Sequence, residues 1–135
     1  MKILCEEYIL THSVAEALGI LSAAQGSARI VSGGSDILLE IQQGSHPPVP
    51  VPVLVDVTEI AEMCALEIRA GSLFIGASIT LSQLARSPLI KQHAQALADA
   101  AALMANPQVC NVATIGDNIA HALPAADGTI SLLAL

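Results

Sequence analysis

Two adjacent glycines precede a polar pair in the segment Gly33-Gly34-Ser35-Asp36. A short apolar run of strand type, residues 28–32, comes before them, and apolar residues at helical spacing follow from Ile37. Adjacent glycines let the backbone turn sharply with its N–H groups unobstructed, and a helix N-terminus carries partial positive charge. The pattern therefore fits the binding of a phosphate group. It fits equally a turn without a ligand, in which Ser35 or Asp36 is the N-cap of the helix.

A second glycine turn is predicted at Thr114-Ile115-Gly116-Asp117-Asn118, after a stretch without helical periodicity. It is followed by Pro124-Ala125-Ala126-Asp127 and by a final apolar run, residues 130–135. Taken singly, each of these segments has the composition of an ordinary turn. They gain meaning only in combination with the first glycine segment.

Composition excludes several classes of protein. The chain has 135 residues, of which 53% are hydrophobic and 13% are charged, so it is not disordered and is long enough for one domain with its own core. A formal net charge of −7, with only five Lys and Arg residues, argues against nucleic acid or an anionic membrane surface as the partner. Without a membrane-spanning run or a signal peptide, the sequence predicts a cytoplasmic protein.

No set of residues has the spacing of a metal site or of a catalytic constellation. Cys5, Cys64 and Cys110 are too far apart for a CxxC-type ligand set, which argues against structural zinc and against a sequence-local iron–sulfur cluster. We expect all three to be small core or near-core residues. No catalytic residue and no metal ligand are predicted.

The first sixty residues read as a small α/β unit. Strands are predicted at residues 3–10 and 28–32, with a helix from Val14 to about Ala24 between them that begins at the capping box Ser13-Val14-Ala15-Glu16. This βαβ order predicts a parallel pair of strands. Residues 46–52 read as an extended, proline-rich connector, and residues 53–57 as a buried strand that adds to the pair.

The pattern changes near Ala61. Residues 66–69 and 72–75 alternate apolar and polar side chains across a tight turn, which predicts a hairpin and the start of a second, antiparallel subdomain. Thr80 and Gln83 form another capping box, which predicts one or two helical turns. Ser87-Pro88 predicts the start of a longer helix to about Met104, which Asn106-Pro107 ends.

Four segments together carry a resemblance to a known family. They are residues 33–36 (Gly-Gly-Ser-Asp), residues 55–60 (Val-Asp-Val-Thr-Glu-Ile), residues 74–77 (Phe-Ile-Gly-Ala) and residues 108–127, which include Thr-Ile-Gly-Asp-Asn and Pro-Ala-Ala-Asp. In order and spacing they resemble the FAD-binding medium subunit of the xanthine dehydrogenase and carbon monoxide dehydrogenase family of molybdenum hydroxylases. The resemblance implies an α+β fold of the p-cresol methylhydroxylase type, with FAD between two subdomains.

The resemblance also implies a domain organisation and a set of cofactor-binding residues. Residues 1–135 would be an FAD-binding domain that is incomplete at its C-terminus, with an α/β subdomain at 1–60 and part of a second subdomain at 61–135. A β-carbon at Gly33 or Gly34 would block the approach of the backbone to phosphate. Backbone amides of the first segment would hold the diphosphate, a second segment would complete the site, and one aspartate would lie on the flavin side: these are Ile30, Val31, Ser32, Gly33, Gly34, Ser35, Asp36 and Ile37, then Thr114, Ile115, Gly116, Asp117 and Asn118, and finally Asp127.

The activity implied by the resemblance is electron transfer. An iron–sulfur small subunit would deliver electrons from a molybdopterin large subunit, and the FAD-binding subunit would pass them to an external acceptor. The cofactor would carry the redox chemistry, which agrees with the lack of catalytic side chains. The sequence departs from the family pattern at Cys110, where arginine is common, and at Asp117, which replaces a glycine and adds negative charge beside the phosphates. An alternative therefore stays open, in which the chain is a truncated, non-catalytic remnant that does not retain flavin.

Overall fold

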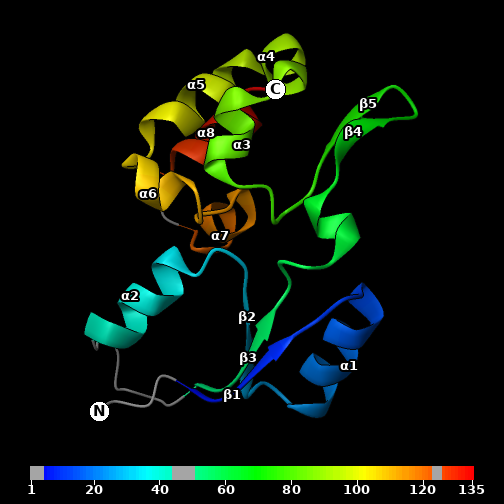
Figure 1. Ribbon diagram of the computed structural model, residues 1–135, viewed down its shortest axis with the longest axis vertical. Coiled ribbons are helices and arrows are strands. Elements are labelled where there is room, and N and C mark those ends of the chain that lie inside the picture. Colours follow the sequence, from blue (N-terminus) through cyan, green and yellow to red (C-terminus); the bar gives the residue numbers. More distant parts are fainter. Residues whose placement is uncertain (1–4, 44–50, 123–125) are drawn as a thin grey trace.

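The computed structural model describes residues 5–43, 51–122 and 126–135. Its N-terminal half contains a three-stranded parallel sheet formed by β1 (Cys5–Leu10), β2 (Ala28–Val31) and β3 (Val51–Asp56). Figure 1 shows this sheet between α1 (Val14–Ala23) and α2 (Ser35–Gln43). Neighbouring residues of β3 account for the two layers, because Leu54 packs with Ile37 of α2 and Val55 with Ala17 of α1.

The order of the strands corrects one prediction from the sequence. β1 and β2 do not pair with each other, since the strand order is β1-β3-β2 and β3 pairs in parallel with both. Burial explains the central place of β3: residues 54–56 are all buried, whereas β1 and β2 carry exposed side chains such as Tyr8 and Ile30. The predicted connector at 46–52 lies outside the described residues up to position 50, and β3 begins at Val51.

Local capping signals are realised with small differences. Ser13 accepts a hydrogen bond from the Glu16 amide at 3.2 Å, as an N-cap should, but the Glu16 carboxylate accepts from the His12 amide rather than from that of Ser13. In α3 (Leu81–Arg86) both halves of the capping box between Thr80 and Gln83 are present. The predicted hairpin is formed by β4 (Leu66–Arg69) and β5 (Ser72–Ile75).

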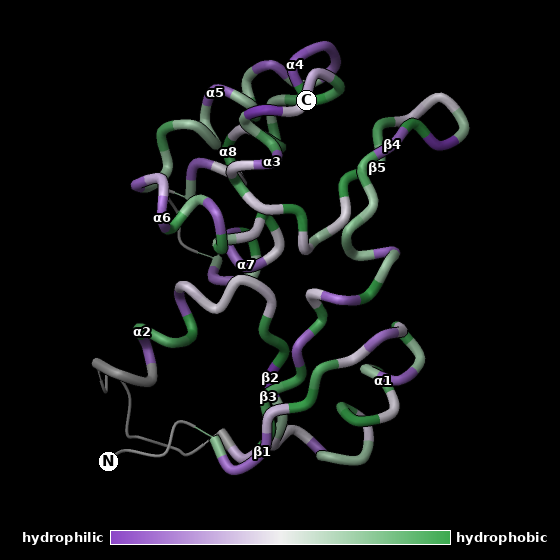
Figure 2. The backbone as a smooth tube through the Cα atoms, in the orientation of Figure 1, coloured by the Kyte–Doolittle hydropathy of each residue, from purple (hydrophilic) through white to green (hydrophobic). Residues whose placement is uncertain are grey.

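The rest of the chain is mainly helical. After the short 3-10 helix η1 (Ala61–Cys64) and the hairpin come α3, α4 (Pro88–His93), α5 (Gln95–Leu103), α6 (Pro107–Cys110), α7 (Ile115–Ala120) and α8 (Asp127–Leu133). Figure 2 shows hydrophobic stretches along β2 and β3 and a hydrophilic stretch at α4. Among the described helices, none has the length and apolar character needed to cross a lipid bilayer.

Two helix predictions were wrong. The expected single helix from Pro88 to about Met104 is broken at Ala94, whose backbone leaves the helical region at φ −150° and ψ 53° while its side chain stays buried. Alanine is a good helix former, so no residue type marks this break. The expected turn at 114–118 is instead the start of α7, with Thr114 as its N-cap.

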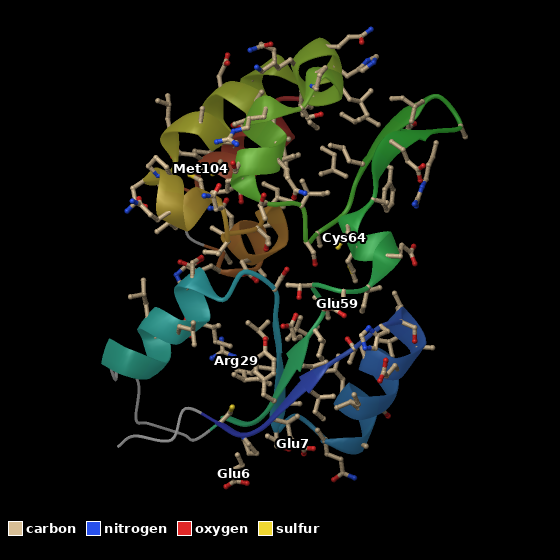
Figure 3. The ribbon with its side chains drawn as sticks, viewed as in Figure 1. Glu6, Glu7, Arg29, Glu59, Cys64 and Met104 are labelled. Atoms are coloured by element: carbon tan, nitrogen blue, oxygen red, sulfur yellow. The ribbon has the colours of Figure 1, made fainter. Side chains whose placement is uncertain are left out.

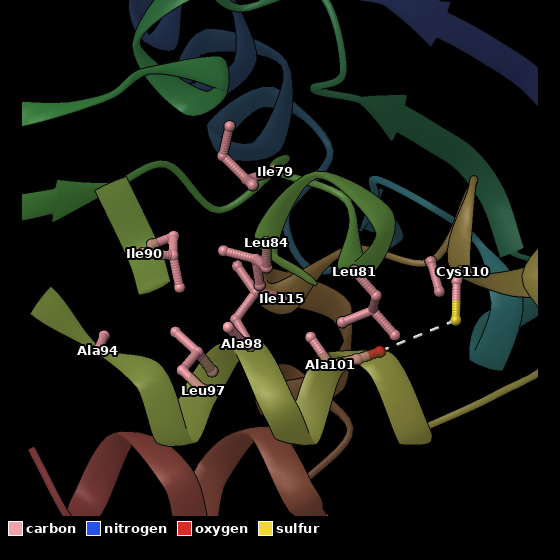
Figure 4. Close-up of a cluster of buried hydrophobic side chains, with 11 residues drawn as sticks. Ile79, Leu81, Leu84, Ile90, Ala94, Leu97, Ala98, Ala101, Cys110 and Ile115 are labelled. Carbon is pink, nitrogen blue, oxygen red and sulfur yellow. Dashed lines mark hydrogen bonds between the residues drawn. The ribbon is translucent and has the colours of Figure 1, made fainter. Parts of the chain in front are cut away.

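A single apolar cluster joins the helices to the hairpin. Figure 4 shows Leu84 near the middle of the cluster and Ile90 and Leu97 towards one side, and each of the three is fully buried. Cys110 belongs to this cluster and lies near the Ala101 carbonyl, so its predicted core position is confirmed. The same prediction was wrong for Cys64, which is exposed and donates from its thiol to the Thr58 carbonyl at 3.0 Å.

Candidate functional site

The two glycine segments, far apart in the sequence, lie side by side in the structure. Figure 1 shows α7 next to the loop between β2 and α2. A β-carbon built on Gly33 would lie 2.2 Å from the Val112 carbonyl oxygen and 2.9 Å from the Thr114 amide nitrogen. Gly33 is therefore required for the contact between the two segments, which differs from the expectation that its missing side chain makes room for phosphate.

Gly34 forms the sharp turn into α2. Its φ of +72° lies in the left-handed region that glycine tolerates best. Its carbonyl accepts the first helical hydrogen bond, from Leu38 at 3.1 Å, and the helix begins at Ser35. Gly34 thus occupies the N-cap position, and the alternative in which Ser35 or Asp36 caps the helix is not what the structure shows.

The start of α2 provides a row of backbone amides. The first four N–H groups of a helix have no partner within it, and here they belong to residues 34–37. The Gly34 amide donates to Oδ2 of Asp117 at 2.7 Å. The amides of Ser35, Asp36 and Ile37 have no acceptor within the part of the chain that the structure describes. Three adjacent donors are therefore available to an anionic group, with the partial positive charge of the helix behind them.

Several side chains of the first segment hold the loop in place. Val31 and Ile37 are buried together with Leu54, so a ligand could meet them only through their backbone. Ile30 is 54% exposed on β2. The hydroxyl of Ser32 donates to the hydroxyl of Ser78 at 3.0 Å, which ties the end of β2 to the segment that precedes α3.

The second segment differs because its amides are already used by the protein. The Ile115 amide donates to the Ile79 carbonyl at 3.0 Å, and the Gly116 amide donates to the Ala77 carbonyl at 2.8 Å. The Asp117 amide donates to the hydroxyl of Thr114, the buried N-cap of α7, at 3.3 Å. A β-carbon on Gly116 would lie 2.7 Å from the Ala77 carbonyl oxygen, so this glycine also serves a close approach of two backbones. The second segment supports the first and offers an anion few donors.

The two remaining predicted residues are Asn118, in α7, and Asp127, at the start of α8. Oδ1 of Asn118 is buried without a donor among the described residues, and a β-carbon on Gly128 would lie 2.4 Å from it. Asp127 is exposed at the first position of α8. No hydrogen bond in the described part of the chain joins Asp127 to the other predicted residues. The structure thus brings the two glycine segments together, and it shows no hydrogen bond from Asp127 to either of them among the described residues.

Charged groups stabilise the neighbourhood of α2. Glu40 accepts from the Arg29 guanidinium at 3.2 Å, and its other oxygen lies 3.3 Å from Nδ1 of His121, at the end of α7. This arrangement links β2, α2 and α7. Figure 3 places Glu6 and Glu7 at the end of the sheet remote from α7, so their charges lie away from the amide row.

The sequence did not single out two polar groups that support the loop. Ser78 is buried and donates to the Val57 carbonyl at 3.3 Å while accepting from Ser32. The buried Asp56, opposite Val31 in the sheet, accepts from the Thr58 amide at 2.8 Å and from the Tyr8 hydroxyl. Burial and the neighbouring carboxylate raise the pKa of Tyr8 to about 12. The Asp-x-Thr pattern at 56–58, typical of a side-chain-capped turn, was the available signal.

The chemistry of the site is that of anion binding. Among the described residues, no group of three or more His, Cys, Asp or Glu side chains is placed to hold a metal ion. The amide row at α2 can hold an anionic ligand, but the carboxylate of Asp117 is itself an anion and already occupies one donor. The amides of Ser35, Asp36 and Ile37 therefore fit a phosphate-containing cofactor. At the fourth amide, that of Gly34, the Asp117 carboxylate competes with such a cofactor.

Comparison with known proteins gives one family. The family described as "FAD binding domain in molybdopterin dehydrogenase" matches residues 4–135. Among curated proteins, the nicotinate dehydrogenase FAD-subunit of Eubacterium barkeri is 29% identical over 96% of this chain. The putative xanthine dehydrogenase FAD-binding subunit of Escherichia coli is 34% identical over 90% of the chain, and so is the carbon monoxide dehydrogenase medium chain of Hydrogenophaga pseudoflava.

Solved structures agree with this match. The carbon monoxide dehydrogenase structure from Hydrogenophaga pseudoflava superposes with a TM-score of 0.81 at 31% identity, over 90% of this chain and 41% of the other. The quinoline 2-oxidoreductase from Pseudomonas putida 86 gives a TM-score of 0.77 at 28% identity, with the same coverage. The chain spans 43%, 40% and 41% of the three curated relatives named above. The expected α+β fold of the FAD-binding domain is therefore confirmed.

Proposed function

Since this chain belongs to the family of FAD binding domains in molybdopterin dehydrogenases, we propose that it is the FAD-binding part of an electron-transfer subunit in a molybdenum-containing hydroxylase. The observation that carries the proposal is the row of amides at Ser35, Asp36 and Ile37, directly after the Gly33-Gly34 turn, which have no acceptor among the described residues. Backbone amides at a helix N-terminus are the usual protein partners of a dinucleotide diphosphate.

The roles of the chain's own residues follow from their contacts. The amides at the start of α2 bind the diphosphate, and Gly34 gives the loop the backbone conformation that aims them. Gly33 positions this loop by its close approach to Val112 and Thr114, and Gly116 packs the second glycine segment against Ala77. FAD, when bound, supplies the electron transfer itself, so the protein needs no acid, base or nucleophile. Asp127, at the flavin side, completes the proposed set of cofactor-binding residues together with Ile30, Val31, Ser32, Ile115 and Asn118, whereas the carboxylate of Asp117 takes one amide of the row.

The proposal extends to domain organisation and partners. We place the boundary between an α/β subdomain and a second subdomain near residue 61, which is supported by the separate apolar clusters on either side of it: Ala17, Val55 and Val57 belong to one, and Leu84 and Leu97 to another. The relative named as a medium chain is one subunit of a larger enzyme. We propose an iron–sulfur small subunit and a molybdopterin large subunit as partners of this chain, in the cytoplasm.

A flavin titration tests this function. The purified chain is titrated with FAD, FMN and riboflavin, and binding is followed by flavin fluorescence. We expect FAD to bind at least tenfold more tightly than the other two, because only FAD carries a diphosphate. Gly34→Ala should weaken FAD binding at least tenfold, since the new β-carbon strains the φ of +72° and moves the amide row.

The matched control is Gly71→Ala in the hairpin turn. Gly71 also has a positive φ, of +82°, but no atom lies within 4 Å of its built β-carbon. This variant should cost a similar amount of stability and leave the FAD affinity unchanged. If the wild-type chain binds no FAD, the proposed function is wrong for this chain, and the alternative of a remnant that does not retain flavin takes its place.

A further inference from the structure

The carboxylate of Asp117 connects the two glycine segments directly. Its Oδ2 accepts from the Gly34 amide at 2.7 Å, across 83 residues of sequence. Asp117 lies in the first turn of α7, and its own amide is held by the N-cap hydroxyl of Thr114. The side chain of Asp117 therefore extends from the first turn of α7 to the amide at the N-cap of α2.

Among the described residues, no basic side chain balances the charge of this carboxylate. The ion pairs there join Arg and His side chains to Glu40, Glu59 and Glu67, and none of them includes Asp117. Its described hydrogen-bond partner is the Gly34 amide. A carboxylate oxygen held by an amide at a helix N-terminus has the same donor and nearly the same geometry as a phosphate oxygen at such a site.

Occupation of this amide has a consequence for ligand binding. An N–H group has one hydrogen and makes one short hydrogen bond, so the Gly34 amide cannot donate fully to Asp117 and to a second anion at once. A phosphate group that reached the amide row would also meet the negative charge of the carboxylate at close range. The Asp117 carboxylate and the diphosphate therefore compete for the Gly34 amide.

We propose that Asp117 is an intramolecular substitute for one phosphate group of FAD. In the cofactor-free chain its carboxylate holds the Gly34 loop in the binding conformation, and it must leave that amide when the diphosphate binds. Asp117 thereby stabilises the empty site and lowers the affinity for the cofactor. This inference rests on the proposed function and adds to it a residue that sets cofactor affinity.

The test uses Asp117→Asn, which keeps the shape of the side chain and removes its charge. FAD affinity is measured for the wild type and the variant at low and at high salt. We expect the variant to bind FAD about tenfold more tightly at low salt, and we expect the gain to shrink at high salt because charge repulsion is screened. Inorganic pyrophosphate, which lacks the flavin and the adenine, should show the same preference for the variant.

A second readout concerns the cofactor-free protein. Without FAD, the Asp117→Asn variant should melt at a lower temperature than the wild type, and hydrogen exchange at the Gly34 amide should be faster, because the charged acceptor is gone. A purely local role of Asp117 in α7 would not change the Gly34 amide. Asp99→Asn is the matched control, since Asp99 is an exposed acid on α5 whose contact is with Gln95. It makes the same change in net charge and should alter neither readout.

The outcomes separate this inference from the proposed function. Equal FAD affinity of wild type and Asp117→Asn at low salt would overturn the role of Asp117 and leave FAD binding intact. Looser binding by the variant would overturn it as well, since Asp117 would then assist the cofactor. Absence of FAD binding in every form would overturn the proposed function, and this inference with it.

Discussion

The two glycine segments have similar sequences and opposite hydrogen-bonding states. Both lie at the start of a helix, and each contains a glycine that allows the close approach of another backbone segment. At the first, the amides of residues 35–37 have no acceptor among the described residues. At the second, the amides of residues 115–117 all donate within the protein, to Ile79, Ala77 and Thr114. The first segment thus offers hydrogen-bond donors to a ligand, and the second segment holds these donors in position.

The comparison shows that a glycine-rich helix start is an anion site only when its amides are free. Most of the residues that decide this lie outside the segment concerned, although the Asp117 amide donates to Thr114 within it. For the second segment they lie at 77–80, a stretch that runs beside it and is joined to it by the bridge between Thr80 and Thr114. For the first segment the deciding residue is Asp117, which occupies one donor of four.

The largest effect is expected from Gly33→Ala, which breaks the contact between the segments. Its β-carbon would fall 2.2 Å from the Val112 carbonyl oxygen, so the backbone must shift. We expect the free energy of unfolding to drop by about 2–4 kcal/mol, measured by urea denaturation. Gly19→Ala, in an open position on α1 with no atom within 4 Å of the built β-carbon, should cause no loss. A Gly33→Ala protein as stable as the Gly19→Ala protein would disprove the close packing described here.

A smaller effect should follow from changing the N-cap of the second segment. Thr114→Val keeps the shape of the buried side chain but removes the oxygen that accepts from the Asp117 amide. We expect a loss of about 1–2 kcal/mol in the free energy of unfolding. Thr114→Ser keeps the capping hydroxyl, so its free energy of unfolding should lie closer to that of the wild type than to that of Thr114→Val. If Val and Ser at this position are equally stable, the cap does not hold α7.

The local parts of this fold could be predicted, because their signals lie in neighbouring residues. Ser13 marks the start of α1, Ala70-Gly71 the hairpin turn, and Thr80 with Gln83 the start of α3. The insertion of β3 between β1 and β2 could not be read locally, because it depends on pairing across the chain. The break at Ala94 has no signal in residue type, and it accompanies the burial of that alanine in the helical core.

The sequence predicted which segments form the candidate site, but only part of how their residues interact. The sequence pointed to both glycine segments and to a conflict between Asp117 and phosphate. It could not show that the Asp117 carboxylate meets the Gly34 amide, or that the amides of 115–117 are already used, because both depend on contacts between distant segments. The roles of individual cofactor-binding residues stay predictions.

The smallest effect concerns pH and the sheet that carries the first segment. The Tyr8 hydroxyl donates to Asp56, and its pKa is raised from 10.0 to about 12 in the folded protein. Folding thus favours the neutral phenol. Its contribution to the free energy of unfolding is complete below pH 10 and is lost as the pH rises from 10 towards 12. Stability should fall over that interval, and only modestly because Tyr8 is 55% exposed. Tyr8→Phe should reduce this fall, which denaturation at a series of pH values would measure; an unchanged fall would assign it to other groups.

The division between the two segments can be tested most directly by following backbone amide signals in a ¹⁵N NMR titration with FAD. The amides of Ser35, Asp36 and Ile37 should shift as FAD binds, because they donate to the diphosphate, and the Gly34 signal should move as it exchanges one acceptor for another. The amides of Ile115 and Gly116 should move little, since they keep their carbonyl partners. Large shifts at Ile115 and Gly116 with unchanged signals at Ser35 and Asp36 would contradict the account.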